Sequence, residues 1–89
     1  MNQIKFERNI NNVFVQTDAV GIWIHCGWSL PIPWDKAVEY VKKYDTDPNA
    51  GFFEHEGKVI LSHNGGKITF SQQESNAVIE LIKTVCPEL

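Results

Sequence analysis

The sequence predicts an α+β domain in which an antiparallel sheet of about five strands carries two helices packed on one face. Some segments alternate β-branched or aromatic residues with polar ones at a period of two, whereas two others space apolar residues as a helix does. The predicted order is β-β-α-β-β-β-α, with a possible extra strand at the N-terminus. Antiparallel strands with helices on one side are typical of this class.

Length and composition predict a single domain, residues 1–89. Its 89 residues leave room for one hydrophobic core, and 43% hydrophobic with 21% charged residues is usual for a globular protein. A chain of this size buries only about 60–65% of the surface that its unfolded form exposes. Each large core side chain is therefore expected to matter for stability.

A three-stranded meander is predicted across residues 52–70. Asn64-Gly65 is a preferred pair for a two-residue type I′ turn, whose central residues need positive φ, and Glu56-Gly57 predicts a second tight turn. Directly opposed residues point to the same side of a sheet, so these turns collect apolar side chains on one face. This dry face comprises Phe52, Val59, Leu61, Ile68 and Phe70.

The last predicted helix begins with a capping box between Ser71 and Glu74 and ends near Pro87. We expect it to lie on the dry face of the meander. Its predicted apolar stripe comprises Val78, Leu81, Ile82 and Val85.

The earlier helix is predicted to start with Pro33 at its first position and to end before the turn-prone segment 45–51. Its apolar positions by spacing are Trp34, Ala37, Val38 and Val41, with Tyr44 a further candidate. This periodicity places Trp34 with the core.

The first half of the chain contains predicted strands at residues 12–16 and 21–26, with 4–7 a weaker candidate that could pair with either. Between Gly27 and Pro33 we expect irregular backbone, because two prolines and a glycine do not fit one regular element.

Charge and terminal residues predict a cytoplasmic protein without a nucleic-acid or membrane partner. Eight Lys and Arg against 11 Asp and Glu give a net charge of −3, and the basic residues are scattered. The first eight residues carry charges where a signal peptide needs an apolar run, and no stretch approaches the ~20 apolar residues of a membrane span. In the cytoplasm, Cys26 and Cys86 are expected to be reduced thiols with structural roles.

No catalytic or cofactor motif is present, so we expect neither enzyme activity nor a cofactor or metal ion. His25 and Cys26 are neighbours on a strand and point to opposite faces. The alternative is a small metal-dependent enzyme or small-molecule-binding protein that uses His25, His55 and Glu56.

Tryptophan is the less ordinary feature of the sequence. Trp23, Trp28 and Trp34 lie within 12 residues, and the last two bracket a proline-stiffened segment. Tryptophan is enriched at interface anchors, and a stiff loop loses little entropy when a partner orders it. Trp28 is equally consistent with a cap on the core, and a sensor in which Trp23 and Trp28 line a pocket is a further alternative.

Strand alternation places Trp23 and His25 on the sheet face that no helix covers. Together with side chains from the meander they are expected to form one apolar patch, unless the strand order separates them into two smaller ones. The predicted partner-binding residues are Phe14, Trp23, His25, Trp28, Phe53, His55 and Ile60.

These features favour a non-enzymatic module that binds another protein, with a homodimer possible. Small acidic domains without catalytic motifs are common among phage- and plasmid-borne inhibitors of host defence systems, such as anti-CRISPR proteins. We expect the chain to be of this class, although no residue motif identifies a particular member.

Overall fold

The computed structural model describes residues 3–44 and 51–86 and shows an α+β fold. Sheet A contains four antiparallel strands in chain order: β1 (Gln3–Phe6), β2 (Val13–Thr17), β3 (Gly21–His25) and β4 (Ser29–Pro33). Helix α1 (Trp34–Lys43) follows. Sheet B contains β5 (Phe52–His55), β6 (Lys58–His63) and β7 (Gly66–Phe70), and helix α2 (Gln72–Val85) completes the described elements.

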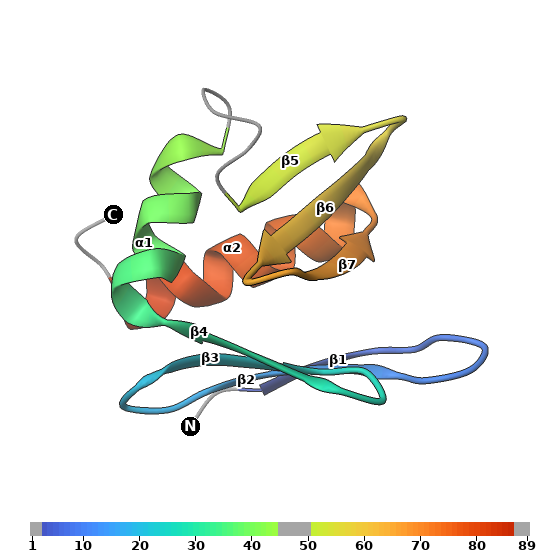
Figure 1. Ribbon diagram of the computed structural model, residues 1–89, viewed down its shortest axis with the longest axis horizontal. Coiled ribbons are helices and arrows are strands. Elements are labelled where there is room, and N and C mark those ends of the chain that lie inside the picture. The colour runs from blue at the N-terminus through green and yellow to red at the C-terminus, as the bar shows by residue number, and fades with distance from the viewer. Residues whose placement is uncertain (1–2, 45–50, 87–89) are drawn as a thin grey trace.

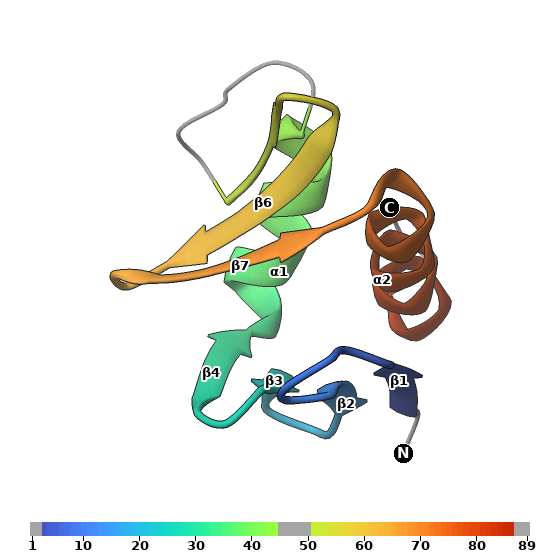
Figure 2. The same cartoon turned by 90° about the vertical axis from the view of Figure 1, so that its right-hand side faces the viewer.

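The predicted α+β class and the rough order of strands and helices are confirmed. The strands form two sheets instead of the expected single one with both helices on one face. Figures 1 and 2 show sheet A below and sheet B above, with α1 rising from the end of β4 to connect them. Helix α1 contacts strands of both sheets, whereas α2 contacts α1, β6 and β7. Each sheet has one apolar face, and the fold buries both faces by turning them toward a shared interior.

The predicted irregular segment before Pro33 is also wrong, because residues 29–33 form the edge strand β4. Trp28 O accepts a hydrogen bond from Cys26 N, and Val20 O accepts one from Trp34 N. Hydrogen-bonded and non-hydrogen-bonded pairs alternate along an antiparallel ladder, so these two bonds place Pro31 and Pro33 in non-hydrogen-bonded pairs with Trp23 and Gly21. At such positions a backbone N–H would point away from β3. An edge strand tolerates proline there without losing a ladder hydrogen bond.

The meander prediction is confirmed in sheet B. Val59 pairs with Phe70, and Phe52 pairs with Leu61. Both turns have positive φ at their central residues: 52° and 78° at Glu56-Gly57, and 49° and 84° at Asn64-Gly65. All five residues of the predicted dry face are buried.

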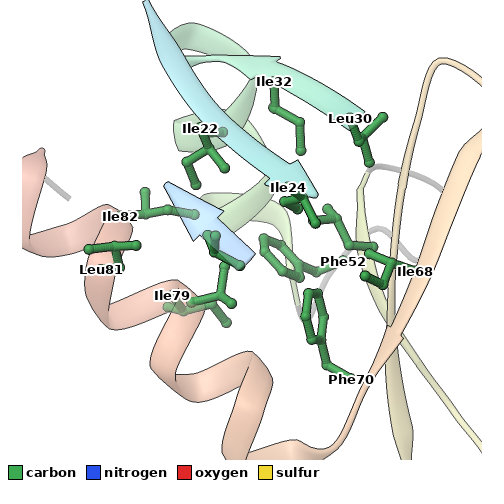
Figure 3. Packing of buried hydrophobic residues seen from close by; sticks show 14 of the residues in the cluster. Ile22, Ile24, Leu30, Ile32, Phe52, Ile68, Phe70, Ile79, Leu81 and Ile82 are labelled. Atoms are coloured by element: carbon green, nitrogen blue, oxygen red, sulfur yellow. The ribbon is translucent and has the colours of Figure 1, made fainter. Parts of the chain in front are cut away.

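One hydrophobic core joins both sheets and α2. Figure 3 shows Ile22 and Ile24 of sheet A, Phe52 and Phe70 of sheet B, and Ile82 of α2 converging on the same interior. The inner positions of sheet A that contribute to this core are Val13, Val15, Ile22, Ile24, Leu30 and Ile32. The outer faces of the two sheets therefore point away from each other.

The helix predictions hold except at the ends. Ser71 and Glu74 form the predicted capping box, and Val78, Leu81 and Ile82 are buried. Val85, the last helical residue, is 36% exposed, so its predicted place in the stripe is wrong. Pro87 and residues 45–50 of the turn-prone segment lie outside the described residues.

Helix α1 begins one residue later than predicted. Pro33 is its N-cap and Trp34 its first helical residue. Ala37 is buried, and Trp34 and Val41 are partly buried against the core, as predicted. The predicted Val38 is not among the residues packed against the core, whereas Tyr40, which was not predicted, packs there.

An ion pair ties the β1–β2 connection to the start of α2. Arg8 Nη1 and Nη2 donate to the two carboxylate oxygens of Glu74 at 2.6 and 2.7 Å. Burial by itself raises the pKa of Glu74, but hydrogen bonds from Arg8 and Ser71, together with the Arg8 charge, outweigh burial and hold this pKa below its ordinary value. The folded state therefore favours the ionised carboxylate.

Replacing Glu74 with glutamine is expected to lower the free energy of unfolding by about 1 kcal/mol at neutral pH. Glutamine keeps the capping geometry and removes the charge. Because the pKa of Glu74 is lowered on folding, the charge stabilises the protein above the ordinary value of 4.5, and this contribution is lost as the pH falls through the folded value. Urea unfolding across pH should show the difference between wild type and variant shrinking in acid. A difference that does not change with pH would contradict this assignment.

Candidate interaction surface

The predicted partner-binding residues do not form one patch, because the two sheets separate them. Phe14, Trp23 and His25 lie on the outer face of sheet A. Phe53, His55 and Ile60 lie on sheet B. The prediction of a continuous surface is wrong, and the alternative of two smaller patches is correct. Within each sheet the predicted orientation holds: Trp23 and Phe53 are both partly exposed.

On sheet A the outer face carries an aromatic row. Phe14 of β2 is opposite His25 of β3. Trp23, two residues before His25, is opposite Gln16 of β2 on one side and Pro31 of β4 on the other. The Trp23 and His25 rings stack with their centroids 6.4 Å apart and an interplanar angle of 10°. Strand pairing fixes the backbone positions of both residues.

A shallow apolar pocket lies beside Trp23. It encloses about 40 Å³, and Val20, Gly21, Ile22, Trp23, Pro31, Ile32 and Pro33 line it. Sites for drug-sized ligands usually measure about 300–1,000 Å³. This hollow, which we call the Trp23 pocket, suits a single apolar side chain better than a whole small molecule.

Asp18 organises the turn at the rim of the Trp23 pocket. Its Oδ1 accepts hydrogen bonds from the backbone N–H groups of Val20 and Gly21 at 2.8 and 3.0 Å, and its Oδ2 accepts the Trp23 indole N–H at 2.8 Å. Its carbonyl accepts the Trp34 indole N–H at 2.9 Å. These bonds fix both tryptophans relative to the turn.

The Asp18 side chain is an exposed anion. The hydrogen bonds from Gly21 and Val20 lower its pKa, and the smaller effect of burial opposes them without reversing the shift. Sequence reasoning missed this residue. Aspartate before a glycine-containing turn is a detectable signal for local backbone capping, but its bonds to the two indoles depend on the folded strand pairing.

Trp28 lies where the two sheets meet. A Cβ added at Gly66 would come within 3.3 Å of the Trp28 ring and 3.0 Å of Leu30, so both side chains pack over the start of β7. Trp28 is nevertheless 43% exposed. Its ring lies against the backbone at Gly66, and it does not line the Trp23 pocket.

The outer face of sheet B is a separate patch. Phe53 faces Ile60 across the strands, and both are partly buried. His55 is exposed beside the β5–β6 turn, where its Nε2 lies 4.0 Å from a carboxylate oxygen of Glu56.

The structure does not bring the candidate metal ligands together. His25 belongs to sheet A, and its Nδ1 lies 2.8 Å from Ser29 Oγ, whereas His55 and Glu56 belong to sheet B. Across residues 3–44 and 51–86, no group of three or more His, Cys, Asp or Glu side chains could hold a metal ion.

The third histidine has a structural environment. His63 is buried at the end of β6, and its Nδ1 lies 2.7 Å from the hydroxyl oxygen of Tyr40 in α1. Burial, with a contribution from the charge of Lys36, lowers the pKa of His63.

Cys26 and Cys86 are both partly buried and are not joined by a disulfide. Burial raises the pKa of Cys26, which disfavours the thiolate that a nucleophile needs.

Comparison of the chain with protein-family models, curated proteins and solved structures finds no match in any of the three. The described part of the chain contains no helix long and apolar enough to cross a membrane.

Proposed function

We propose that this chain is a non-enzymatic module that binds another protein through the outer face of sheet A. The observation that supports the proposal best is the Trp23 pocket, an apolar hollow whose walls come from paired strands. Side chains on strands are held more precisely than side chains on loops, so a partner pays little entropy to order them. A rigid tryptophan at the edge of such a pocket is a common interface anchor.

The neighbouring residues extend this surface. Phe14 and His25 continue the aromatic row away from the pocket, and the exposed Val20 adds an apolar side chain at the rim, where it is 67% exposed. We assign the binding role to these residues together with Trp23, Pro31 and Pro33. The biological setting that fits a small acidic module of this kind is inhibition of a host defence system, as in anti-CRISPR proteins.

The proposal predicts that Val20→Glu and Trp23→Ala each weaken partner binding at least about tenfold while the domain stays folded. Val20→Glu is the sharper variant, because this side chain is exposed and its backbone bond to Asp18 is kept. The tagged chain is used to capture proteins from an extract of its native host, and bound proteins are quantified by mass spectrometry.

Phe53→Ala is the matched control, since it removes an aromatic ring from the outer face of sheet B. It should capture the same proteins as the wild type. Circular dichroism and thermal unfolding of every variant separate lost binding from lost folding. Proteins that are lost with Phe53→Ala but retained with Val20→Glu would move the binding role to sheet B and contradict the proposal.

A further inference from the structure

The Trp23 pocket lies at an acidic end of sheet A. The Asp18 carboxylate contacts three groups of its lining, the N–H groups of Val20 and Gly21 and the Trp23 indole. Asp35 is exposed in the first turn of α1, two residues after the lining residue Pro33. Lys36 lies 3.6 Å from a carboxylate oxygen of Glu39, and in the described residues no lysine or arginine forms an ion pair with Asp18.

Asp18 retains both charge and an acceptor position. An ionised carboxylate offers about four lone-pair sites, and three neutral N–H donors occupy only part of them. Its hydrogen bonds stabilise the anion without neutralising it. A cation on a partner would therefore find an exposed, fixed carboxylate beside the apolar hollow.

The backbone around the pocket offers a partner few donors. Pro31 and Pro33 take the outward positions of the β4 edge and have no N–H to give. The indole N–H of Trp23 is already donated to Asp18. A partner therefore cannot add a strand along this part of β4, and Trp23 cannot donate a hydrogen bond to a peptide carbonyl. Recognition must rely on side chains.

From this arrangement we infer that the partner is a protein segment that inserts one apolar side chain into the Trp23 pocket and pairs an adjacent lysine or arginine with Asp18. The inference rests on the proposed function and specifies the chemistry of its partner. The size of the pocket limits the apolar group to a single side chain. The negative charge at the rim of the pocket favours a basic residue next to that side chain in the partner. An acidic neighbour would be repelled by Asp18 and by the overall charge of −3.

A random 12-residue phage-display peptide library tests this inference on the immobilised wild-type chain, with Val20→Glu for counter-selection. Enriched peptides are expected to share an apolar residue within two positions of a lysine or arginine. In a synthetic enriched peptide, citrulline in place of arginine, or glutamine in place of lysine, should weaken binding about two- to fivefold at 50 mM salt. The effect should fade at 500 mM salt, where screening is stronger.

The Asp18→Asn variant provides the matched measurement. Replacing the basic residue of the peptide with a neutral one should not weaken its binding to this variant, because both changes remove the same ion pair. Citrulline or glutamine peptides that bind the wild type as well as the parent would overturn the inference and leave the proposed function standing. Failure to enrich any peptide that depends on Val20 would overturn it too.

Sedimentation of the free chain tests the competing occupant. The inference expects no self-association that depends on the pocket. Dimerisation that rises with concentration and disappears in Val20→Glu would show that a second copy fills the pocket, and would overturn the assignment to a basic segment of another protein. The capture experiment described above distinguishes these results from failure of the proposed function, because it makes no assumption about the partner's charge.

Discussion

Replacing Phe70 with alanine is expected to lower the free energy of unfolding by about 3–5 kcal/mol. Phe70 on β7 is fully buried, and its ring makes an edge-to-face contact with Phe6 on β1, with centroids 5.7 Å apart. The side chain thus joins the two sheets, and its removal leaves a cavity at their junction. A domain of this size has a total stability of only about 5–13 kcal/mol, so the loss is a large fraction of it.

Urea unfolding monitored by circular dichroism measures this effect. Phe53→Ala is the control, because it removes the same ring from the partly exposed outer face of sheet B. Its cost should be clearly smaller. Equal costs for the two variants would show that Phe70 does not occupy a core shared between the sheets.

The parts of the fold that the sequence predicts correctly depend on nearby residues. The turns at Glu56-Gly57 and Asn64-Gly65 need positive φ, and their position fixes the register of both hairpins of sheet B. The capping box at Ser71 likewise involves residues three positions apart. Each of these features is determined within a few residues, so no knowledge of the tertiary structure is required.

The division into two sheets could not be predicted, because the period of a strand shows which side chains share a face and not which strands pair. β4 was missed for a related reason. Leu30 and Ile32 are buried while Pro31 and Pro33 are exposed, which is an ordinary alternation. Two prolines indicate a break in a central strand, but they are compatible with an edge.

The candidate site was predicted in part. The outward orientation of Trp23 follows from alternation with Ile22 and Ile24, and the structure confirms it. Its separation from Phe53 follows from the sheet division. The role of Asp18 depends on an indole five residues away and another sixteen residues away, which only the folded turn brings to it.

Gly21→Ala is expected to lower the free energy of unfolding by about 3 kcal/mol, at the upper end of the range for overpacking. A Cβ at Gly21 would overlap the carbonyl oxygen of Ile32 and would lie 2.9 Å from the Cα of Pro33, so β3 and β4 would have to separate. The obstacle is backbone, which has no rotamer to move. Since these residues also line the Trp23 pocket, partner binding should weaken along with stability.

Gly57→Ala separates this steric effect from conformational strain. Nothing lies within 4 Å of a Cβ at Gly57, but its φ of +78° disfavours alanine. That strain alone should cost about 1–2 kcal/mol, less than the steric cost at Gly21, and partner binding should be unchanged because Gly57 lies in the β5–β6 turn of sheet B. Thermal and urea unfolding of both variants test the comparison. A smaller loss of stability for Gly21→Ala than for Gly57→Ala would mean that β4 can move away from β3 at little cost. The walls of the Trp23 pocket would then lack the rigidity on which the binding proposal depends.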